Sequence, residues 1–468
     1  MSALQSDLQR GWQIHQQRRF AEAEHIYRDV LGKSPSDANA WCFLGIALHD
    51  QRQYASAVDC YRKALKLNPT FPVALNNLGN SLRYVNCVEE ADQCFQKAID
   101  LKPDYLNAFK NRGTLHVWTG ALDRGLAYYE QALKINPNEA ELHRNLGVIY
   151  LLQGRFQEGW NEYRWRWKVG DLHRTNRTIP VWDGSNLTGR KILLTAEQGL
   201  GDTLNFVRFA QVLRSSGAQT MVHCQPQLLA LLQNAPKLGP LYPNSLNIEQ
   251  PMDAQCSLVD VADILHINEQ NIPRSCPYLF PSPQLTSYWA RRFPKHAQNP
   301  KQPQEPSTRR IGIAWQGNPD HQADAFRSLP LACFEPFAEI PGIELISLQS
   351  GFGTEQIAKW NGAKPIISLG PEVDKTSGAF MDTAAIMLQL DLVITSDTSI
   401  AHLAGALGVP TWLALNYVPD WRWLLQREDS PWYPSVRLFR QNVPGDWGGV
   451  FRKIQIALLD RTWVTDET

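Results

Sequence analysis

The chain has 468 residues, more than one ordinary domain needs, and its basic and acidic residues balance at 46 each. A net charge of zero argues against nucleic acid as the main partner, because neutralising phosphates needs a basic surplus. There is no run of about 18 apolar residues and the first ten residues are polar, so we expect a cytoplasmic protein without a membrane span. The eight cysteines include no Cys-x-x-Cys pair, which favours reduced thiols over disulfides or zinc.

The first part of the chain repeats with a period of 34 residues. Three kinds of residue keep this interval: Gly11, Gly45, Gly79, Gly113 and Gly147; Pro35, Pro69, Pro103 and Pro137; Tyr27, Tyr61, Phe95, Tyr129 and Tyr163. Small residues let the two helices of a unit approach, the aromatic fills the gap to the next unit, and proline ends the second helix. The pattern resembles the tetratricopeptide (TPR) family and predicts an α-solenoid of about five repeats over residues 1–168.

A TPR array performs no chemistry, and its inner surface is by default a groove for a protein partner. Asparagines on the first helices stand three, four or seven positions apart, so several share one face: Asn76, Asn77, Asn80, Asn107 and Asn111. Their amides could bond a peptide backbone, and an ordinary solvated polar face explains them equally well.

The fifth unit departs from the pattern at its end. It lacks the terminal proline, and its second helix runs into Trp160, Tyr163, Trp165 and Trp167. Four large aromatics this close together would form an exposed apolar patch if they stayed in water. We therefore expect residues 158–168 to dock on the following domain and to fix the angle of the groove.

After a linker at 169–187, strand and helix signals alternate, which is typical of parallel sheets wrapped by helices. The predicted strands are 191–195, 221–224, 310–315, 344–348, 392–395 and 411–415. A proline-rich stretch at 293–310 indicates a hinge between the two series. The expected fold is therefore α plus α/β, with an N-terminal lobe at 188–300 and a C-terminal lobe at 308–468. Two Rossmann-like lobes are the anatomy of a GT-B glycosyltransferase, although other two-lobed proteins share it.

The first loop motif, Ala196 to Thr203, directly follows a strand and opens a helix. Gly199 and Gly201 let the backbone approach a ligand, and helix N–H groups point toward it. The third glycine of a dinucleotide fingerprint is absent, because Leu204 stands there, so a nicotinamide site is not expected. Asp202 at the helix start could be a cap residue, a role compatible with catalysis.

Further motifs follow strands of the second series. Gly317 and the basic Arg327 lie near a strand end, an arrangement that suits a diphosphate. Hydroxyl residues from 396 to 399 open another helix, whose N–H groups and dipole attract anions. Two alternatives remain here: Asp397 only caps this helix, and His402, one turn in, is a packed core histidine.

These motifs resemble the family 9 glycosyltransferases, which include the ADP-heptose:lipopolysaccharide heptosyltransferases. The resemblance implies that Asp202 is the catalytic acid/base residue and that Gln198, Gly199 and Gly201 form an acceptor-side loop. It also implies a nucleotide-sugar site on the C-terminal lobe, for which the candidates are Gly317, Asn318, Arg327, Gln349, Asp382, Thr383, Ser396, Asp397, Thr398, Ser399 and His402. Two positions differ from the family: Ser399 replaces its usual glycine, and Arg327 stands where lysine is usual in heptosyltransferases.

The chain also resembles bacterial proteins that fuse TPR repeats to such a domain. They share the strings 158–160, 196–201, 382–385, 397–408, 420–423 and 430–434. The resemblance implies inverting, metal-independent transfer of a hexosyl or heptosyl group from an ADP- or UDP-linked donor, with no cofactor and no metal. The acceptor would be a glycan, lipid-sugar or protein, presented with help from the TPR groove. The alternatives are a protein O-glycosyltransferase of the O-GlcNAc type, which shares the architecture, a TPR scaffold with an inactive transferase domain, and another two-lobed enzyme such as an epimerase.

Overall fold

The computed structural model describes residues 3–170, 172, 178–248, 250–293, 308–321 and 323–460. The chain divides into two compact units, residues 1–142 and 143–468, which we call the repeat unit and the two-lobed unit. The predicted repeat boundary at residue 168 therefore lies inside the two-lobed unit. The predicted linker at 169–187 and hinge at 293–310 lie partly outside the described residues.

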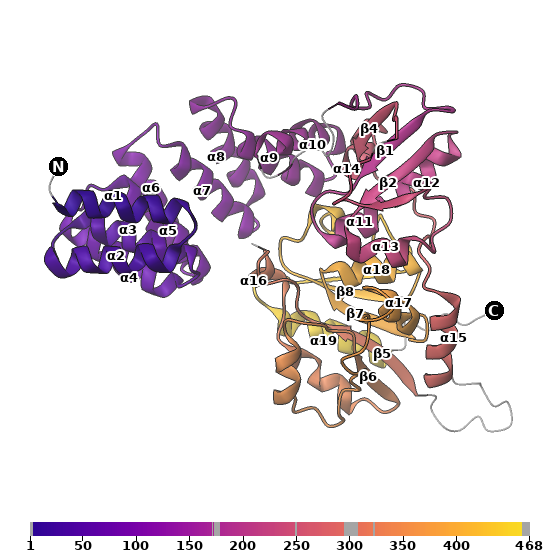
Figure 1. Ribbon diagram of the computed structural model, residues 1–468. Coiled ribbons are helices and arrows are strands. Elements are labelled where there is room, and N and C mark those ends of the chain that lie inside the picture. Colours follow the sequence, from indigo (N-terminus) through magenta and orange to yellow (C-terminus); the bar gives the residue numbers. More distant parts are fainter. Residues whose placement is uncertain are drawn as a thin grey trace. The chain divides into compact units, whose positions relative to one another are not determined.

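Antiparallel helical pairs build the repeat unit, as the 34-residue period predicted (Figure 1). Each first helix packs on the second helix of its own pair, and each second helix ends two residues before the repeated proline. The helices are α1 (Ala3–Gln16), α2 (Phe20–Lys33), α3 (Ala38–Asp50), α4 (Tyr54–Leu67), α5 (Pro72–Tyr84), α6 (Val88–Leu101), α7 (Leu106–Trp118) and α8 (Leu122–Ile135).

The repeated glycine has a steric cause. A Cβ built on Gly45 would lie 2.6 Å from the ring of Tyr61, which belongs to the same pair. A residue without a side chain therefore lets the ring lie directly on the helix backbone. The aromatic fills space inside its own pair, where the sequence predicted only the gap to the next unit. Tyr27 does both, because it also stacks on Phe43 of the following pair, with ring centroids 5.6 Å apart.

From His143 on, the last helical pair belongs to the two-lobed unit. It consists of α9 (Ala140–Leu152) and α10 (Phe156–Tyr163), and the 3-10 turn η1 (Arg164–Lys168) continues α10. Trp160 is 3% exposed, and its Nε1 donates to the carbonyl of Ile267 at 2.9 Å. Trp165 instead stacks on His143 within the pair, with centroids 4.0 Å apart. The predicted docking of this segment on the next domain is thus confirmed at Trp160, and Trp165 packs within the pair.

The first lobe is a parallel sheet of four strands in the order β3-β2-β1-β4. Its strands are β1 (Lys191–Thr195), β2 (Gln219–Cys224), β3 (Leu241–Pro243) and β4 (Ala254–Ser257). Its helices are α11 (Leu200–Phe206), α12 (Arg208–Ser215), η2 (Pro226–Leu228), α13 (Leu229–Leu232) and α14 (Leu258–Ile264). Thr195 pairs with His223 on one side and Ser257 on the other, so these three strands end at the same edge of the sheet.

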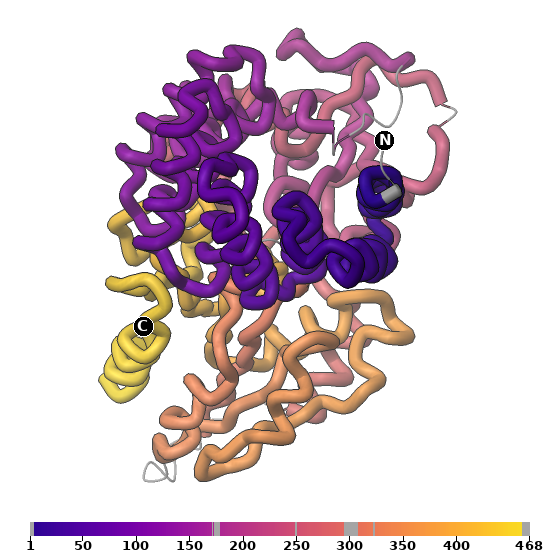
Figure 2. The backbone as a smooth tube through the Cα atoms, turned by 90° about the vertical axis from the view of Figure 1, so that its left-hand side faces the viewer, coloured from indigo at the N-terminus to yellow at the C-terminus, as the bar shows by residue number. Residues whose placement is uncertain are grey.

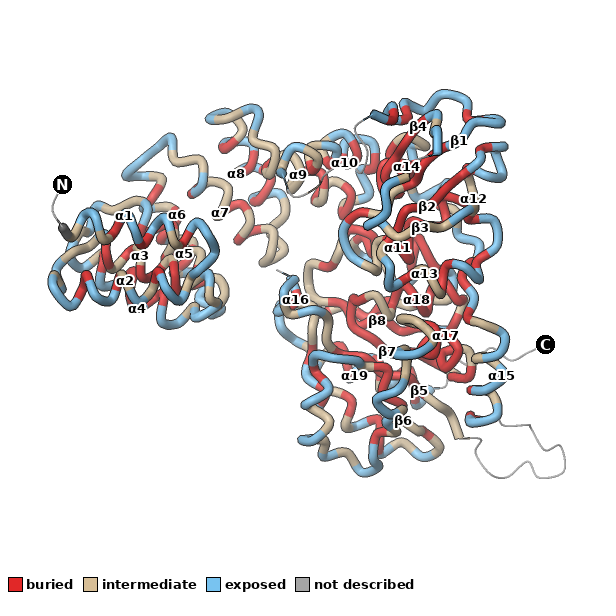
Figure 3. The backbone as a smooth tube through the Cα atoms, in the orientation of Figure 1, coloured by how far each residue is buried: buried red, intermediate tan, exposed pale blue. Residues whose placement is uncertain are grey.

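The second lobe is a parallel sheet of five strands in the order β6-β5-β7-β8-β9. Its strands are β5 (Arg309–Ala314), β6 (Ile343–Ser347), β7 (Leu392–Ser396), β8 (Thr411–Leu415) and β9 (Val436–Arg440). Its helices are α16 (Asp324–Arg327), η3 (Leu331–Glu339), η4 (Thr354–Lys359), α17 (Met381–Met387), α18 (Ser399–Leu407), η5 (Trp421–Trp423) and α19 (Trp447–Leu459). The strands are almost wholly buried, as Figure 3 shows, because helices and turns cover both faces.

The chain completes the first lobe before it begins the second, as the colours of Figure 2 show. Between them α15 (Pro283–Arg292) packs on α17 of the second lobe. An aromatic cluster joins α10, α11 and the segment after β8: Trp421 lies 5.3 Å from Trp160 and 6.3 Å from Phe206 between ring centroids. The two lobes and the end of the helical region thus share one hydrophobic contact.

Two sequence expectations can be compared with the structure directly. All eight cysteines carry free thiols, as predicted. None of the described helices combines the length and the apolarity that crossing a bilayer requires.

Candidate functional site

The structure brings two of the predicted motifs together across the lobes, because α11 lies against α18. A Cβ built on Gly201 would lie 2.9 Å from Cδ2 of His402 and 3.5 Å from Cα of Ser399. The missing side chain at position 201 therefore lets the loop after β1 approach the first turn of α18. This contact places the neighbourhood of Asp202 opposite the predicted nucleotide-sugar turn.

Asp202 lies in the first turn of α11, and both of its carboxylate oxygens accept hydrogen bonds. Oδ2 accepts the N–H of Gly199 at 2.9 Å, and Oδ1 accepts Nη2 of Arg422. The bond to Gly199 caps α11, which is the structural role that the sequence also allowed for Asp202. Each carboxylate oxygen has two lone pairs and the side chain is 20% exposed, so the group can still accept another proton or donor.

Arg422, which the sequence analysis did not single out, is the cation at this junction. Its side chain is 6% exposed, and Nη1 donates to Asp420 at 2.8 Å. The guanidinium lies over the rings of Phe206 and Trp421, 4.9 and 4.6 Å from their centroids. Burial opposes its charge, but Asp420 and Asp202 together raise the pKa of Arg422 above its usual value. The string 420–423 had signalled a resemblance, and nothing in it revealed that Arg422 would reach Asp202.

Asp397, at the end of β7, is buried at 5% exposure. Burial, with the nearby carboxylate of Asp420, raises the pKa of Asp397 above the usual range, although Arg327 acts in the opposite direction. The helix cap predicted for Asp397 belongs to its neighbour: the hydroxyl of Thr398 accepts the N–H of Ile400 at 3.3 Å. Among the described residues, no three His, Cys, Asp or Glu side chains are grouped so that they could hold a metal ion.

His402 is held in a chain of hydrogen bonds. Its Nδ1 lies 2.9 Å from the hydroxyl of Tyr433, which accepts Nδ2 of Asn205 at 2.7 Å. Burial lowers the pKa of His402 to about 3, so the ring is neutral near neutral pH. The ring turns its Cδ2–Nε2 edge toward Gly201, and a Cβ built there would lie 3.7 Å from Nε2. His402 is therefore a packed histidine, as the alternative predicted, whose Nε2 edge faces the first lobe.

Gly317 lets the short helix α16 fold over the end of β5. A Cβ at this position would lie 2.5 Å from Oδ1 of Asp324 and 3.1 Å from Nη2 of Arg327. Burial raises the pKa of Asp397 and lowers that of His402, and the positive charge of Arg327 lowers both. Arg327 therefore interacts electrostatically with the turn at 397–402.

Two other candidates brace loops. Asn318 accepts the N–H of Asp320 at 2.9 Å, which closes a local turn. Gln349 accepts the N–H groups of Trp315 and Gln316 at 2.9 and 3.1 Å and donates to the carbonyls of Gln316 and Phe352. Its amide is fully engaged with the loop after β5, so Gln349 shapes the site and has no free group for a ligand.

Asp382 and Thr383 fix the start of α17. Asp382 accepts Nε1 of Trp289 on α15 at 2.8 Å, and its other oxygen accepts the N–H of Asp374 and the hydroxyl of Ser377. The N–H of Thr383 in turn donates to Asp374 at 3.1 Å. These bonds tie α15 to the second lobe, and none of them reaches the cluster around Asp202.

Some buried polar atoms of the second lobe have no hydrogen-bond partner, among them Oγ of Ser396, Nε of Arg422 and Nη1 of Arg440. Nε of Arg327 is in the same position, although it lies 3.5 Å from Asp324 in an ion pair. Burial lowers the pKa of Arg440 to about 10, while the charge of Asp397 opposes that shift. A buried N–H group without an acceptor is costly, and guanidinium N–H groups suit an anionic partner. Arg440, at the end of β9, is a second residue that the sequence analysis missed.

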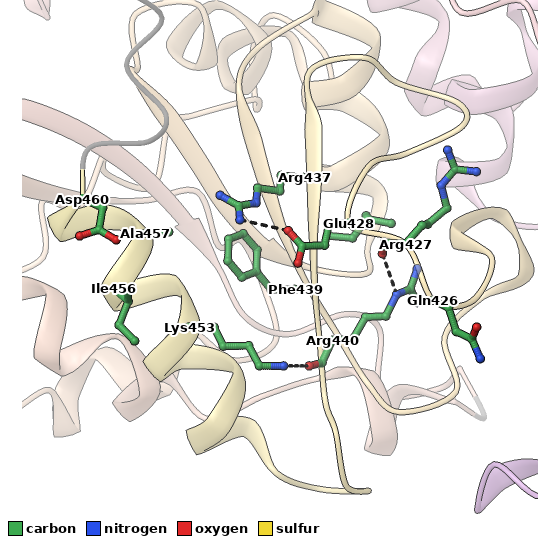
Figure 4. Close-up of a pocket in the computed structure, with 11 residues that line it drawn as sticks. Gln426, Arg427, Glu428, Arg437, Phe439, Arg440, Lys453, Ile456, Ala457 and Asp460 are labelled. Atoms are coloured by element: carbon green, nitrogen blue, oxygen red, sulfur yellow. Dashed lines mark hydrogen bonds and ion pairs between the residues drawn. The ribbon is translucent and has the colours of Figure 1, made fainter.

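A cavity of about 500 Å³ lies next to this edge, against β9 and α19 (Figure 4). Arg437 pairs there with Glu428 at 3.1 Å, and Lys453 donates to the backbone carbonyl of Arg440 at 3.2 Å. Glu428 and Asp460 add negative charge to the lining, which makes the cavity less suited to an anion.

Comparisons with known proteins identify the helical pairs. Models described as "Tetratricopeptide repeat" match residues 38–71 and 60–93, and one described as "TPR repeat" matches residues 118–154. The N-terminal region is therefore a TPR solenoid.

The chain is also similar to Protein FlbA of Caulobacter vibrioides, with 26% identity over 321 residues, which are 64% of this chain and 52% of the relative. It thus spans about half the length of that protein. Solved structures with some likeness include TTC0263, a thermophilic TPR protein of Thermus thermophilus, and PilF of Pseudomonas aeruginosa. Both are 21% identical, with TM-scores of 0.34 and 0.35, and the matches cover 36% and 46% of this chain and 94% and 87% of theirs.

Proposed function

We propose that this chain is a TPR-containing GT-B glycosyltransferase of the heptosyltransferase-like class, which transfers a sugar from a nucleoside-diphosphate donor with inversion and without a metal ion. The observation that supports it most is the meeting of Asp202, on the first lobe, with the cationic cluster around α18 on the second. A base on one side and anion-binding donors on the other are what such a transfer needs.

The second lobe would hold the donor. The first turn of α18, the half-buried guanidinium groups of Arg327 and Arg440, and the hydroxyl of Ser396 would offer N–H and O–H donors. When the bond between the anomeric carbon and the diphosphate breaks, the diphosphate leaves with the electron pair. These donors would stabilise the charge that builds up on it.

The first lobe would activate the acceptor. The acceptor hydroxyl attacks the anomeric carbon, and its proton passes to Asp202. Arg422 would hold the carboxylate in orientation through Oδ1. Transfer of the proton would then depend on good placement of the acceptor hydroxyl beside this carboxylate.

The solenoid would bring a protein partner or the acceptor itself, since TPR repeats are protein-interaction modules. The acceptor would be a glycan, a lipid-linked sugar or a protein. A protein acceptor would make the chain a protein O-glycosyltransferase, which is the alternative within the same chemistry.

A second candidate is a TPR scaffold whose transferase-like part no longer reacts. One observation favours it: both oxygens of Asp202 serve the local structure, one as a helix cap and one in the pair with Arg422. These two bonds are enough to explain why an aspartate stands at position 202, without any catalytic role.

The deciding experiment offers the full chain a panel of ADP-, UDP- and GDP-linked sugars and measures both calorimetric binding of the free nucleotides and slow hydrolysis of the donors. Binding and release of one nucleoside diphosphate support the transferase. Absence of both for the whole panel contradicts the transferase and leaves the scaffold.

A further inference from the structure

The loop that carries Asp202 starts from an unusual backbone conformation. Gln198 has a φ of 62°, in the left-handed region that residues other than glycine rarely adopt. Gly199 follows at once, so the conformation of Gln198 sets the direction in which the loop leaves β1. A residue keeps such a conformation only where its surroundings hold it.

Two of the contacts that hold this loop come from the end of the helical region. Nε2 of Gln198 donates to the hydroxyl of Tyr163 at 3.0 Å, and the neighbouring Glu197 accepts Nε of Arg166 at 2.8 Å. Tyr163 is the last residue of α10, and Arg166 lies in η1. The end of α10 and the turn η1 thus bind Gln198 and Glu197, the two residues that precede Gly199.

The contact through Arg166 is closed to water. Its Nη2 also donates to Oδ1 of Asp260, on α14, at 2.5 Å. Arg166 is 3% exposed, and Glu197 and Asp260 are each 9% exposed. One buried guanidinium between two carboxylates has little freedom to change geometry, because breaking either pair leaves a buried charge without its partner. The network therefore fixes η1, the loop after β1 and α14 in one arrangement.

The last helical pair in turn holds Tyr163 from behind. A Cβ built on Gly147, in α9, would lie 2.5 Å from the backbone nitrogen of Tyr163, so α9 and α10 are in direct backbone contact. His143 of α9 also lies 2.5 Å from the carboxylate of Glu162 through its Nδ1. These contacts hold the backbone at Tyr163, whose hydroxyl accepts the hydrogen bond from Gln198.

We propose that Tyr163 and Arg166 are positioning residues for the transfer site, which hold the loop after β1 so that Asp202 faces α18. The last helical pair is then a working part of the transferase and not only the end of the solenoid. The inference rests on the proposed function. It goes beyond the docking of α10 and η1 on the first lobe. Other contacts, such as the pair of Arg164 with Asp263 at 2.8 Å, hold this segment on the lobe without touching the loop after β1.

The test uses the full chain with Tyr163→Phe, which removes one hydroxyl and keeps the ring, and Arg166→Lys beside Arg166→Gln. Arg164→Gln is the matched control, since it removes an ion pair of the same turn to the same lobe. Hydrogen exchange is measured on peptides covering 196–206, together with donor turnover and calorimetric affinity for UDP and ADP. We expect faster exchange in the loop and a kcat about 10- to 100-fold lower in Tyr163→Phe, with nucleotide affinity unchanged and the control like the wild type. Lysine at 166 should retain more turnover than glutamine.

Loop exchange and kcat at the control value in Tyr163→Phe would overturn the inference. So would an equal fall of kcat in Arg164→Gln, since any weakening of the docked segment would then suffice. If the wild type binds no nucleotide and turns over no donor, the proposed function fails by itself. Hydrogen exchange in Tyr163→Phe still decides in that case whether the last helical pair holds the loop.

Discussion

Arg422 of the second lobe donates a hydrogen bond to the carboxylate of Asp202 of the first lobe, across 220 positions of sequence. The same guanidinium donates to Asp420 at 2.8 Å. Arginine does not lose its proton in proteins, so Arg422 stays a cation between the two carboxylates. The position of the proposed base is thus set by both lobes together, and any change in their separation would move Asp202 relative to its partner.

Replacing the base should remove transfer and leave the fold. We expect Asp202→Asn to lower transfer by ~10²–10⁴-fold, the usual contribution of a general base, because the amide cannot take up the acceptor proton. Nucleoside-diphosphate affinity should stay near the wild-type value, since the donor cluster lies on the other lobe. Steady-state kinetics and calorimetry measure the two quantities.

Asp183→Asn is the control for this substitution, because Asp183 is an exposed carboxylate that accepts the N–H of Ser185 in its own turn at 3.0 Å. It should leave both quantities unchanged. Full turnover in Asp202→Asn would remove Asp202 from the mechanism and favour its role as a cap.

The repeats and most of the strands could be predicted from the sequence because their causes are local or periodic. Each unit needs a glycine where its aromatic ring lies on the helix, as Gly45 does under Tyr61. The buried strands are short apolar runs between turn signals. β9 and α19 were not predicted, although Val436 and Ile454 are buried in the second lobe. Their apolar residues are interrupted by basic ones, which weakens both the strand and the helix signal.

The site was only partly predictable, since its members come from separate segments. The loop at 199–202 and the turn at 397–402 were found because each is a glycine- or hydroxyl-rich helix start. Arg422 and Arg440 stand in no recognisable sequence motif. Arg422 belongs to the site through its hydrogen bond to Asp202, and Arg440 through its electrostatic interaction with Asp397. A motif can also serve only the fold: Asp382 bonds Trp289 of α15 and Asp374 in the segment before α17.

Removing donors from the cluster should weaken nucleotide binding. Arg327→Ala and His402→Ala should each cost about 1.5–3 kcal/mol of nucleoside-diphosphate affinity if they make charge-assisted or buried hydrogen bonds. Calorimetric titration with the nucleotide found in the donor panel measures the loss. Arg309→Ala is the control, because Arg309 lies at the opposite end of β5 and pairs with Asp391 at 3.0 Å. Unchanged affinity in both test variants would contradict the site.

Transfer should survive removal of divalent ions. Guanidinium groups and the N–H groups of α18 would stabilise the leaving diphosphate in place of a metal. We expect turnover within about twofold of the untreated enzyme after treatment with EDTA, with magnesium added back as the control. A strict requirement for magnesium or manganese would contradict the proposed class.

Acid should destabilise the two-lobed unit through His402. The folded protein keeps the pKa of His402 at about 3, below the ordinary 6.5. Below pH 6.5 the unfolded chain therefore takes up a proton that the folded chain refuses, and the free energy of unfolding falls as the pH falls toward 3. The contribution is at most about 1.4 kcal/mol per pH unit. Urea unfolding between pH 7 and 5 should give a shallower pH dependence for His402→Gln than for the wild type, and equal slopes would contradict this assignment.

The contact between the lobes at Gly201 should tolerate no side chain. An alanine Cβ would lie 2.9 Å from the ring of His402, closer than real Cβ contacts, and the ring is locked by Tyr433 and cannot turn away freely. We expect Gly201→Ala to destabilise the protein by about 1–3 kcal/mol, the usual cost of overpacking, and to lower transfer further because the loop with Asp202 must move away from α18. Gly32→Ala is the control, because Gly32 lies within α2 with no atom near its Cβ position, and alanine there should stabilise the helix by about 0.5–1 kcal/mol. Thermal unfolding and turnover of the two variants decide the question: a Gly201→Ala protein as stable and active as the wild type would show that the lobes do not meet at this residue in solution.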